Sequence, residues 1–128
     1  MDRLQAEIEM VRAEHPSLQC GTDLDWVLIA DFALPPGWNR ERTRLLLLIP
    51  SGYPQIPPDN FYVDVGLRTA AGEMPGSYSE PVGQIGDNWG QFSWHADMES
   101  WRPAPEPGAG HNLRTVVDLI WKRLSEVP

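Results

Sequence analysis

The sequence is short of cysteine, of long apolar runs and of positive charge, and each shortage excludes a class of protein. Its 128 residues include one cysteine, Cys20, which rules out an internal disulfide and a cysteine-based metal site. The longest apolar run, Leu45 to Pro50, is far below the ~20 residues that a membrane span needs. The first residues carry charges throughout and lack the apolar core of a secretory signal. We therefore expect a cytoplasmic protein.

Positive charge is outnumbered by negative charge. Lysine and arginine together number 10 against 18 for aspartate and glutamate, which gives a formal charge of −8. An acidic surface repels phosphate, so nucleic acid and anionic membranes are disfavoured as partners, and a basic protein face is favoured. The hydrophobic share of 41% is typical of a globular chain, and the length predicts a single domain over residues 1–128.

Hydrophobic periodicity predicts helices at both ends of the chain with strands between them. Apolar residues three and four positions apart indicate helices, and short alternating runs rich in β-branched or aromatic residues indicate strands. The expected helices are 3–14 and about 112–125, with Asn112 as N-cap of the second, and the expected strands are 24–34, 42–49 and 60–65. Residues 66–110 show little periodicity and are expected to form a long irregular stretch. Consecutive strands normally pair antiparallel, so the prediction is an α+β fold whose helices cover one face of the sheet.

Catalytic candidates are few, and the best is His95, with Ser93 before it and Asp97 after it. A Ser-His-Asp site needs three side chains within hydrogen-bond distance. In an extended chain this spacing leaves neighbours ~6–7 Å apart, so a hydrolase is disfavoured unless the segment bends. The alternative is that His95 hydrogen-bonds the backbone and holds the loop in shape.

Metal and cofactor binding lack a supporting pattern. His95 and Asp97 offer two ligands with no histidine or cysteine nearby as a third. The glycine-rich phosphate-binding motifs and the paired-histidine zinc motif are absent from the sequence. We expect neither a metal nor a cofactor.

Two proline-containing segments resemble the ubiquitin-conjugating (UBC) superfamily. The segment Pro50 to Pro58, PSGYPQIPP, resembles its P-x-x-Y-P-x-x-P-P signature, and a strand follows. Trp101-Arg102-Pro103 resembles its W-x-P motif before a helix. Residues 89–95, WGQFSWH, resemble the prokaryotic family E branch, apart from an inserted Gly90. The resemblance implies a UBC-like fold: an N-terminal helix, an antiparallel meander of about four strands, a long irregular active-site-like loop and a C-terminal helix.

The sequence departs from ordinary conjugating enzymes at the reactive position. Those enzymes place their catalytic cysteine about eight residues before the tryptophan of W-x-P, and counting back from Trp101 reaches Ser93. The family's His-Pro-Asn motif is also missing, since Asp87 precedes Asn88. A serine hydroxyl is a far weaker nucleophile than a thiolate unless a base activates it. The resemblance therefore leaves two functions open.

The first is a non-catalytic adaptor, similar to the eukaryotic UEV and RWD domains, that binds a ubiquitin-like protein or its activating or deconjugating partner. The second is an unorthodox transferase that uses Ser93 and His95 in place of cysteine. A third interpretation is an unrelated α+β interaction module whose proline-rich loops match by chance. The resemblance implies a ubiquitin-like protein, a ThiF-like activating enzyme and a JAB-type isopeptidase as partners. The expected partner-binding residues are Tyr53, Pro54, Trp94, Trp101 and Arg102, although Trp101 suits a structural lid equally well.

Overall fold

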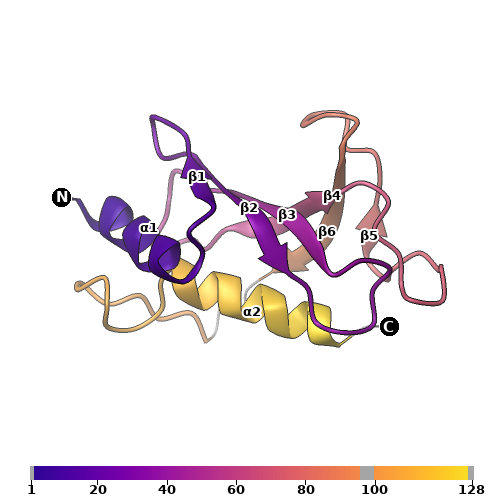
Figure 1. Ribbon diagram of the computed structural model, residues 1–128. Coiled ribbons are helices and arrows are strands. Elements are labelled where there is room, and N and C mark those ends of the chain that lie inside the picture. The colour runs from indigo at the N-terminus through magenta and orange to yellow at the C-terminus, as the bar shows by residue number, and fades with distance from the viewer. Residues whose placement is uncertain (1, 96–99, 127–128) are drawn as a thin grey trace.

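The computed structural model describes residues 2–95 and 100–126, and it shows an antiparallel sheet with a helix at each end of the chain (Figure 1). The helices are α1 (Arg3–Glu14) and α2 (Leu113–Ser125). The strands are β1 (Leu18–Cys20), β2 (Trp26–Ala33), β3 (Arg42–Leu48), β4 (Asp59–Asp64), β5 (Tyr78–Ser79) and β6 (Trp89–His95). The predicted α+β class, both helices and the three predicted strands are confirmed.

The sheet has six strands, in the order β1-β2-β3-β4-β6-β5, rather than about four. Three strands were not predicted: the short β1, and β5 and β6, which are regular elements inside the stretch 66–110 that was expected to be irregular. β6 escaped detection because Gly90 occupies one of its inward positions and leaves Phe92 as the only large apolar residue that is fully buried. Residues 89–95 therefore belong to the sheet, and Ser93 and His95 lie on a strand.

The core lies between the sheet and α2, which runs along one face of the sheet in Figure 1. Helix α2 presents a stripe of buried apolar side chains at three- and four-residue spacing: Leu113, Val116, Val117, Ile120 and Leu124. The buried strand residues include Ile29, Leu45, Leu47, Phe61, Val63 and Phe92. Phe61 and Phe92 stack with ring centroids 4.9 Å apart, which joins β4 to β6 inside the core.

Side-chain caps begin both helices. Asp2 accepts a hydrogen bond from the backbone of Gln5 at 2.8 Å. Asn112 and Thr115 form a reciprocal capping box, which confirms the predicted N-cap of α2. Within the described residues, no helix has the length and apolar character needed to cross a lipid bilayer.

Candidate functional site

Ser93 lies at an irregularity in the pairing of β6 with β4. The regular pairs on either side are Phe61 with Phe92 and Asp59 with His95. Between them β4 contributes one residue, Asn60, whereas β6 contributes two, Ser93 and Trp94, so β6 carries a bulge. Asn60 has a left-handed backbone with φ of 62°, and its side-chain Oδ1 accepts from the Trp94 backbone at 3.1 Å. A bulge redirects side chains, but no contact between the Ser93 and His95 side chains is found among the described residues.

His95 is held by a carboxylate that the sequence did not single out. Its Nδ1 contacts the carboxylate of Asp59 on the neighbouring strand. An ionised carboxylate only accepts hydrogen bonds, so Nδ1 carries a hydrogen in this contact. The two side chains are 74% and 59% exposed. The predicted partner Asp97 lies outside the described residues.

The Ser93 side chain is exposed, like that of His95 two residues further along the strand. The Ser93 backbone N–H donates to the carbonyl of Ser77 at 2.8 Å, which ties β6 to the segment before β5. Among residues 2–95 and 100–126, the Ser93 hydroxyl makes no hydrogen bond, so the position predicted to be reactive presents an exposed serine side chain.

The buried side chain of Trp101 connects the Trp-x-Pro segment to the Tyr-Pro loop of residues 50–58. It is only 4% exposed, and its indole N–H donates to the carbonyl of Pro54 at 2.7 Å. Its ring also packs near Tyr53 and His111, at centroid distances of 6.3 and 5.4 Å. The Trp-x-Pro and Tyr-Pro segments thus form one hydrogen-bonded unit, in which Trp101 packs as a structural lid.

A buried carboxylate anchors this unit to both helices. Glu7 on α1 has no exposed surface, and it accepts from Arg3 Nε and from the Leu113 backbone, each at 2.8 Å, and from the Tyr53 hydroxyl. Burial, followed by the hydrogen bond to Glu7, raises the pKa of Tyr53 above its ordinary value. Tyr53 therefore remains a protonated donor and fixes the 50–58 loop against the start of α2.

Arg102 and His111 close the proline-rich loop between them. The Arg102 backbone N–H donates to His111 Nδ1 at 2.8 Å, and the His111 backbone N–H donates to the Arg102 carbonyl at 2.9 Å. The side chain of Arg102 is exposed, so it is available to a partner, whereas Trp94 is half-buried against Phe61. Of the predicted partner-binding residues, Arg102 is the one that lies fully at the surface.

A groove of about 410 Å³ lies between the end of β6 and α2. Trp94, His95, Trp101 and His111 line one side, and α2 contributes cationic side chains from Lys122 and Arg123 together with Leu119. Three residues that the sequence analysis named, Trp94, His95 and Trp101, therefore line the same groove. Within the described residues, no group of three or more histidine, cysteine, aspartate or glutamate side chains is arranged to hold a metal ion.

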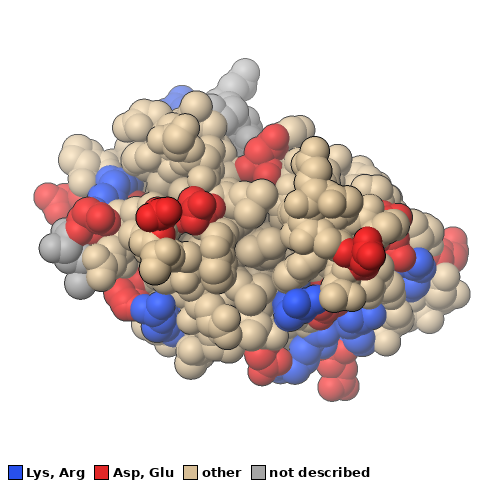
Figure 2. Space-filling view, turned by 90° about the horizontal axis from the view of Figure 1, so that it is seen from above, with Lys and Arg blue, Asp and Glu red and all other residues tan. Residues whose placement is uncertain are grey.

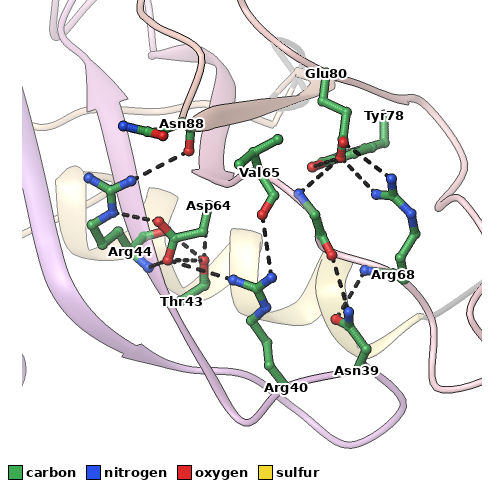
Figure 3. Close-up of polar contacts among 11 residues, drawn as sticks. Asn39, Arg40, Thr43, Arg44, Asp64, Val65, Arg68, Tyr78, Glu80 and Asn88 are labelled. Atoms are coloured by element: carbon green, nitrogen blue, oxygen red, sulfur yellow. Dashed lines mark hydrogen bonds and ion pairs between the residues drawn. The ribbon is translucent and has the colours of Figure 1, made fainter.

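A second polar region, the arginine cluster, was missed by the sequence reasoning (Figure 3). It comprises Arg40, Arg44 and Arg68 with Asp64 and Glu80. The Arg44 backbone N–H donates to Asp64 at 3.0 Å, its guanidinium pairs with the same carboxylate, and Arg40 lies 3.9 Å away. Burial raises the pKa of Asp64, but the hydrogen bonds from Arg44 outweigh it and leave that pKa below its usual value. Of these arginines, Arg44 lies on β3, whereas Arg40 precedes that strand and Arg68 follows β4, so no local spacing in the sequence announced the cluster.

The other half of the arginine cluster centres on Glu80. Arg68 donates to Glu80 at 2.7 and 3.1 Å, and the Tyr78 hydroxyl and the Gly66 backbone donate at 2.7 and 3.0 Å. The Arg68 hydrogen bond lowers the pKa of Glu80 to about 2. Figure 2 shows arginine and acidic side chains adjoining along one edge of the face it displays, beside a broad uncharged area. These arginines are paired with carboxylates, which joins β3 to β4 through Asp64 and joins Arg68 to Glu80, next to β5.

The inserted Gly90 has a steric reason. A Cβ at this position would lie 2.0 Å from the Tyr78 hydroxyl oxygen. Tyr78 cannot easily move, because its ring packs on Phe92 at 5.0 Å and its hydroxyl is bonded to Glu80. Glycine is therefore required for β5 and β6 to pair at this distance.

A helix, an antiparallel sheet with the Tyr-Pro loop between β3 and β4, a Trp-x-Pro segment and a second helix together define a UBC-like protein. The family model described as prokaryotic E2 family E matches residues 16–127, and the chain belongs to that family. No curated protein and no solved structure matches the chain at a significant level. Family membership ties the chain to ubiquitin-like conjugation in general and overturns the interpretation as an unrelated α+β module.

Proposed function

We propose that this protein is an adaptor in a bacterial ubiquitin-like conjugation system, with no thioester chemistry of its own. It binds a ubiquitin-like protein and presents it to a ThiF-like activating enzyme or a JAB-type isopeptidase. Membership of prokaryotic E2 family E supports the pathway. The adaptor works in the cytoplasm, in keeping with a chain that has a single cysteine.

The observation that carries this proposal is the position of the only thiol. Cys20 lies on β1, whereas Ser93 lies on β6, four strands away in the sheet order. At about 4.8 Å between neighbouring strands, the two residues lie on strands roughly 19 Å apart. Cys20 is therefore remote from the position where a conjugating enzyme carries its reactive thiol, which supports a role in binding without thioester transfer.

The proposed binding surface combines the 50–58 loop with the segment after β6. Arg102 and Ile56 are exposed there, and Trp94 offers part of its ring at the groove. Arginine and aromatic residues are the usual energetic anchors of protein interfaces. This surface is supported from within the protein by Tyr53, Pro54 and Trp101. The excess of acidic residues over the whole chain favours encounter with a partner that has a basic face.

Isothermal titration with a purified ubiquitin-like protein of the same organism tests the adaptor. We expect a 1:1 complex that Arg102→Ala weakens at least tenfold, since loss of an anchor residue costs about 1–2 kcal/mol or more. Arg114→Ala is the matched control, because Arg114 is an exposed arginine on α2 that pairs only with Glu14 at the far side of the helix pair. Binding should be unchanged in Cys20→Ser. Absence of a complex, or a reductant-sensitive adduct on Cys20, would overturn the proposal.

A further inference from the structure

His111 makes a hydrogen bond that only a neutral imidazole can make. Its Nδ1 accepts from the Arg102 backbone N–H at 2.8 Å. A backbone amide only donates through its nitrogen, so Nδ1 carries the lone pair, and the hydrogen of the neutral ring is on Nε2. A protonated imidazole carries hydrogens on both nitrogens and has no acceptor left. In that form the two N–H groups would face each other, and this hydrogen bond would be lost.

This bond is one of a pair that closes the proline-rich loop 102–111, and we call the pair the His111 clasp. In the other bond, the His111 backbone N–H donates to the Arg102 carbonyl at 2.9 Å. Pro103 and Gly110 form an antiparallel bridge just inside the clasp, and a Cβ at Gly110 would lie 2.7 Å from the Arg102 carbonyl oxygen. In a regular antiparallel pair both acceptors are carbonyl oxygens. Here a titratable side chain replaces one of them.

We propose that His111 is a positioning residue for the partner-binding surface, and that it holds Arg102 in place only while its imidazole is neutral. The inference rests on the proposed function for the role of Arg102 as an anchor, and it adds a control of that anchor by pH. The Arg102 guanidinium donates to the Trp101 carbonyl at 2.9 Å, and Trp101 is itself bonded to Pro54. Opening the clasp therefore frees the backbone of an exposed anchor beside a fixed neighbour.

The surroundings of His111 hold one other group that changes charge over the same pH range. Within the described residues, the titratable side chains around it come from every neighbouring element: Arg3 and Glu7 from α1, Tyr53 from the 50–58 loop, His95 from β6, Glu106 from the loop 102–111, and Lys122, Arg123 and Glu126 from α2. Arginine, lysine, glutamate and tyrosine side chains ordinarily keep their charge where histidine titrates. His95 is therefore the group whose contribution an experiment must separate from that of His111.

The direction of the pH effect follows from the clasp. Histidine side chains ordinarily change charge between about pH 5 and 8. Above this range the ring is neutral, Nδ1 accepts and the loop is closed. As the pH falls through the range, protonation removes the acceptor and the closed form loses a hydrogen bond, which shifts such an equilibrium by roughly fivefold. Acid therefore opens the loop and weakens binding through Arg102.

A ¹⁵N–¹⁵N scalar coupling across the hydrogen bond tests the clasp without any partner. In the ¹⁵N-labelled full chain we expect a coupling between the Arg102 amide nitrogen and His111 Nδ1 at about pH 8, and its loss at about pH 5. The variants His15→Gln and His95→Gln, which remove the two other histidines, should show the same loss. A coupling absent at the higher pH, or retained at the lower one, would overturn the proposal.

Two substitutions of His111 separate its acceptor from its charge. His111→Asn places an amide oxygen near the position of Nδ1, so the Arg102 amide should stay protected from hydrogen exchange at both pH values. His111→Ala removes the acceptor, so this protection should be lost at both. Protection of the Arg102 amide in His111→Ala, as strong as in the wild type, would refute the assignment of Nδ1 as its acceptor.

Isothermal titration with the ubiquitin-like protein at the same two pH values links the clasp to binding. Between about pH 8 and 5 the affinity of the wild type should fall roughly fivefold more than that of His111→Asn, which retains any effect of the partner's own titration. An equal pH dependence of the two proteins would overturn the positioning of Arg102 by His111. A clasp that opens with acid in a protein that forms no complex at either pH would overturn the adaptor and leave the clasp standing.

Discussion

Glu7→Gln probes the most deeply buried charge of the described structure. The carboxylate has no exposed surface, and it accepts from Arg3, Tyr53 and Leu113. Glutamine keeps the shape but has one acceptor oxygen. If that oxygen stays with Tyr53 and Leu113, the new amide N–H₂ faces the Arg3 guanidinium, donor against donor. The substitution therefore removes both the ion pair and one charge-assisted hydrogen bond.

The expected cost follows from these contacts. A hydrogen bond to a charged group contributes about 1.5–3 kcal/mol, and breaking a fully buried pair costs about 3–5 kcal/mol. Arg3 is 21% exposed and can turn partly toward water, so the lower part of this range applies. We expect Glu7→Gln to lower the free energy of unfolding by about 2–3 kcal/mol.

Urea unfolding followed by tryptophan fluorescence measures this change. With an m-value of about 1–3 kcal/mol/M, the midpoint should fall by roughly 1 M or more. Glu14→Gln is the matched control on the same helix, because its pair with Arg114 is about half exposed and an exposed pair contributes under ~1 kcal/mol. Both variants remove one negative charge, so their difference isolates burial. Equal midpoints for the two variants would refute the reasoning.

Three further changes test other parts of the sheet. Because the pKa of Glu80 is lowered from 4.5 to about 2, its contribution is present above pH 4.5 and should be lost as the pH falls toward 2; after allowance for solvent screening we expect about 1–2 kcal/mol, measured by acid titration of stability and absent in Glu80→Gln. Gly90→Ala should destabilise by about 1–3 kcal/mol in thermal unfolding because of the clash with Tyr78, whereas Gly83→Ala, where nothing lies within 4 Å, should be nearly neutral. Ser93→Cys should leave the free energy of unfolding within about 0.5 kcal/mol in urea unfolding, because the side chain is exposed; a destabilised variant would mean that Ser93 has a structural role.

The parts of the fold that the sequence predicted are those where local pattern and burial agree. Helix α2 has a strict apolar stripe and a capping residue, and its start at Leu113 was placed within a residue by Asn112. The strands 42–49 and 60–65 have consecutive apolar residues that the core then buries. β6 was missed because Gly90 replaces an apolar side chain, and the reason for that glycine is Tyr78, a residue on another strand. Local periodicity cannot report a steric constraint that arises only when two strands pair.

The sequence predicted those parts of the candidate site that depend on local motifs and missed those that depend on contacts between strands. Counting from the Trp-x-Pro motif located Ser93, and the aromatic segment drew attention to His95. The carboxylate was sought at Asp97, close in sequence, whereas the described partner is Asp59. The arginine cluster was likewise missed, since Arg68 and Glu80 meet only through the turn between β4 and β5. Contacts between distant residues need the strand register, which the sequence did not supply.

The two faces of β6 are constrained differently by the fold. Phe92 points into the core against Phe61, whereas Ser93 and His95 point outward. Trp101 is constrained separately, through Pro54 on the other segment of the signature. Packing therefore restricts the signature residues, but it places no demand on the side chain at position 93. A change at position 93 therefore leaves the core contacts of Phe92 and the hydrogen bond of Trp101 intact, whereas a change at either of those two residues does not.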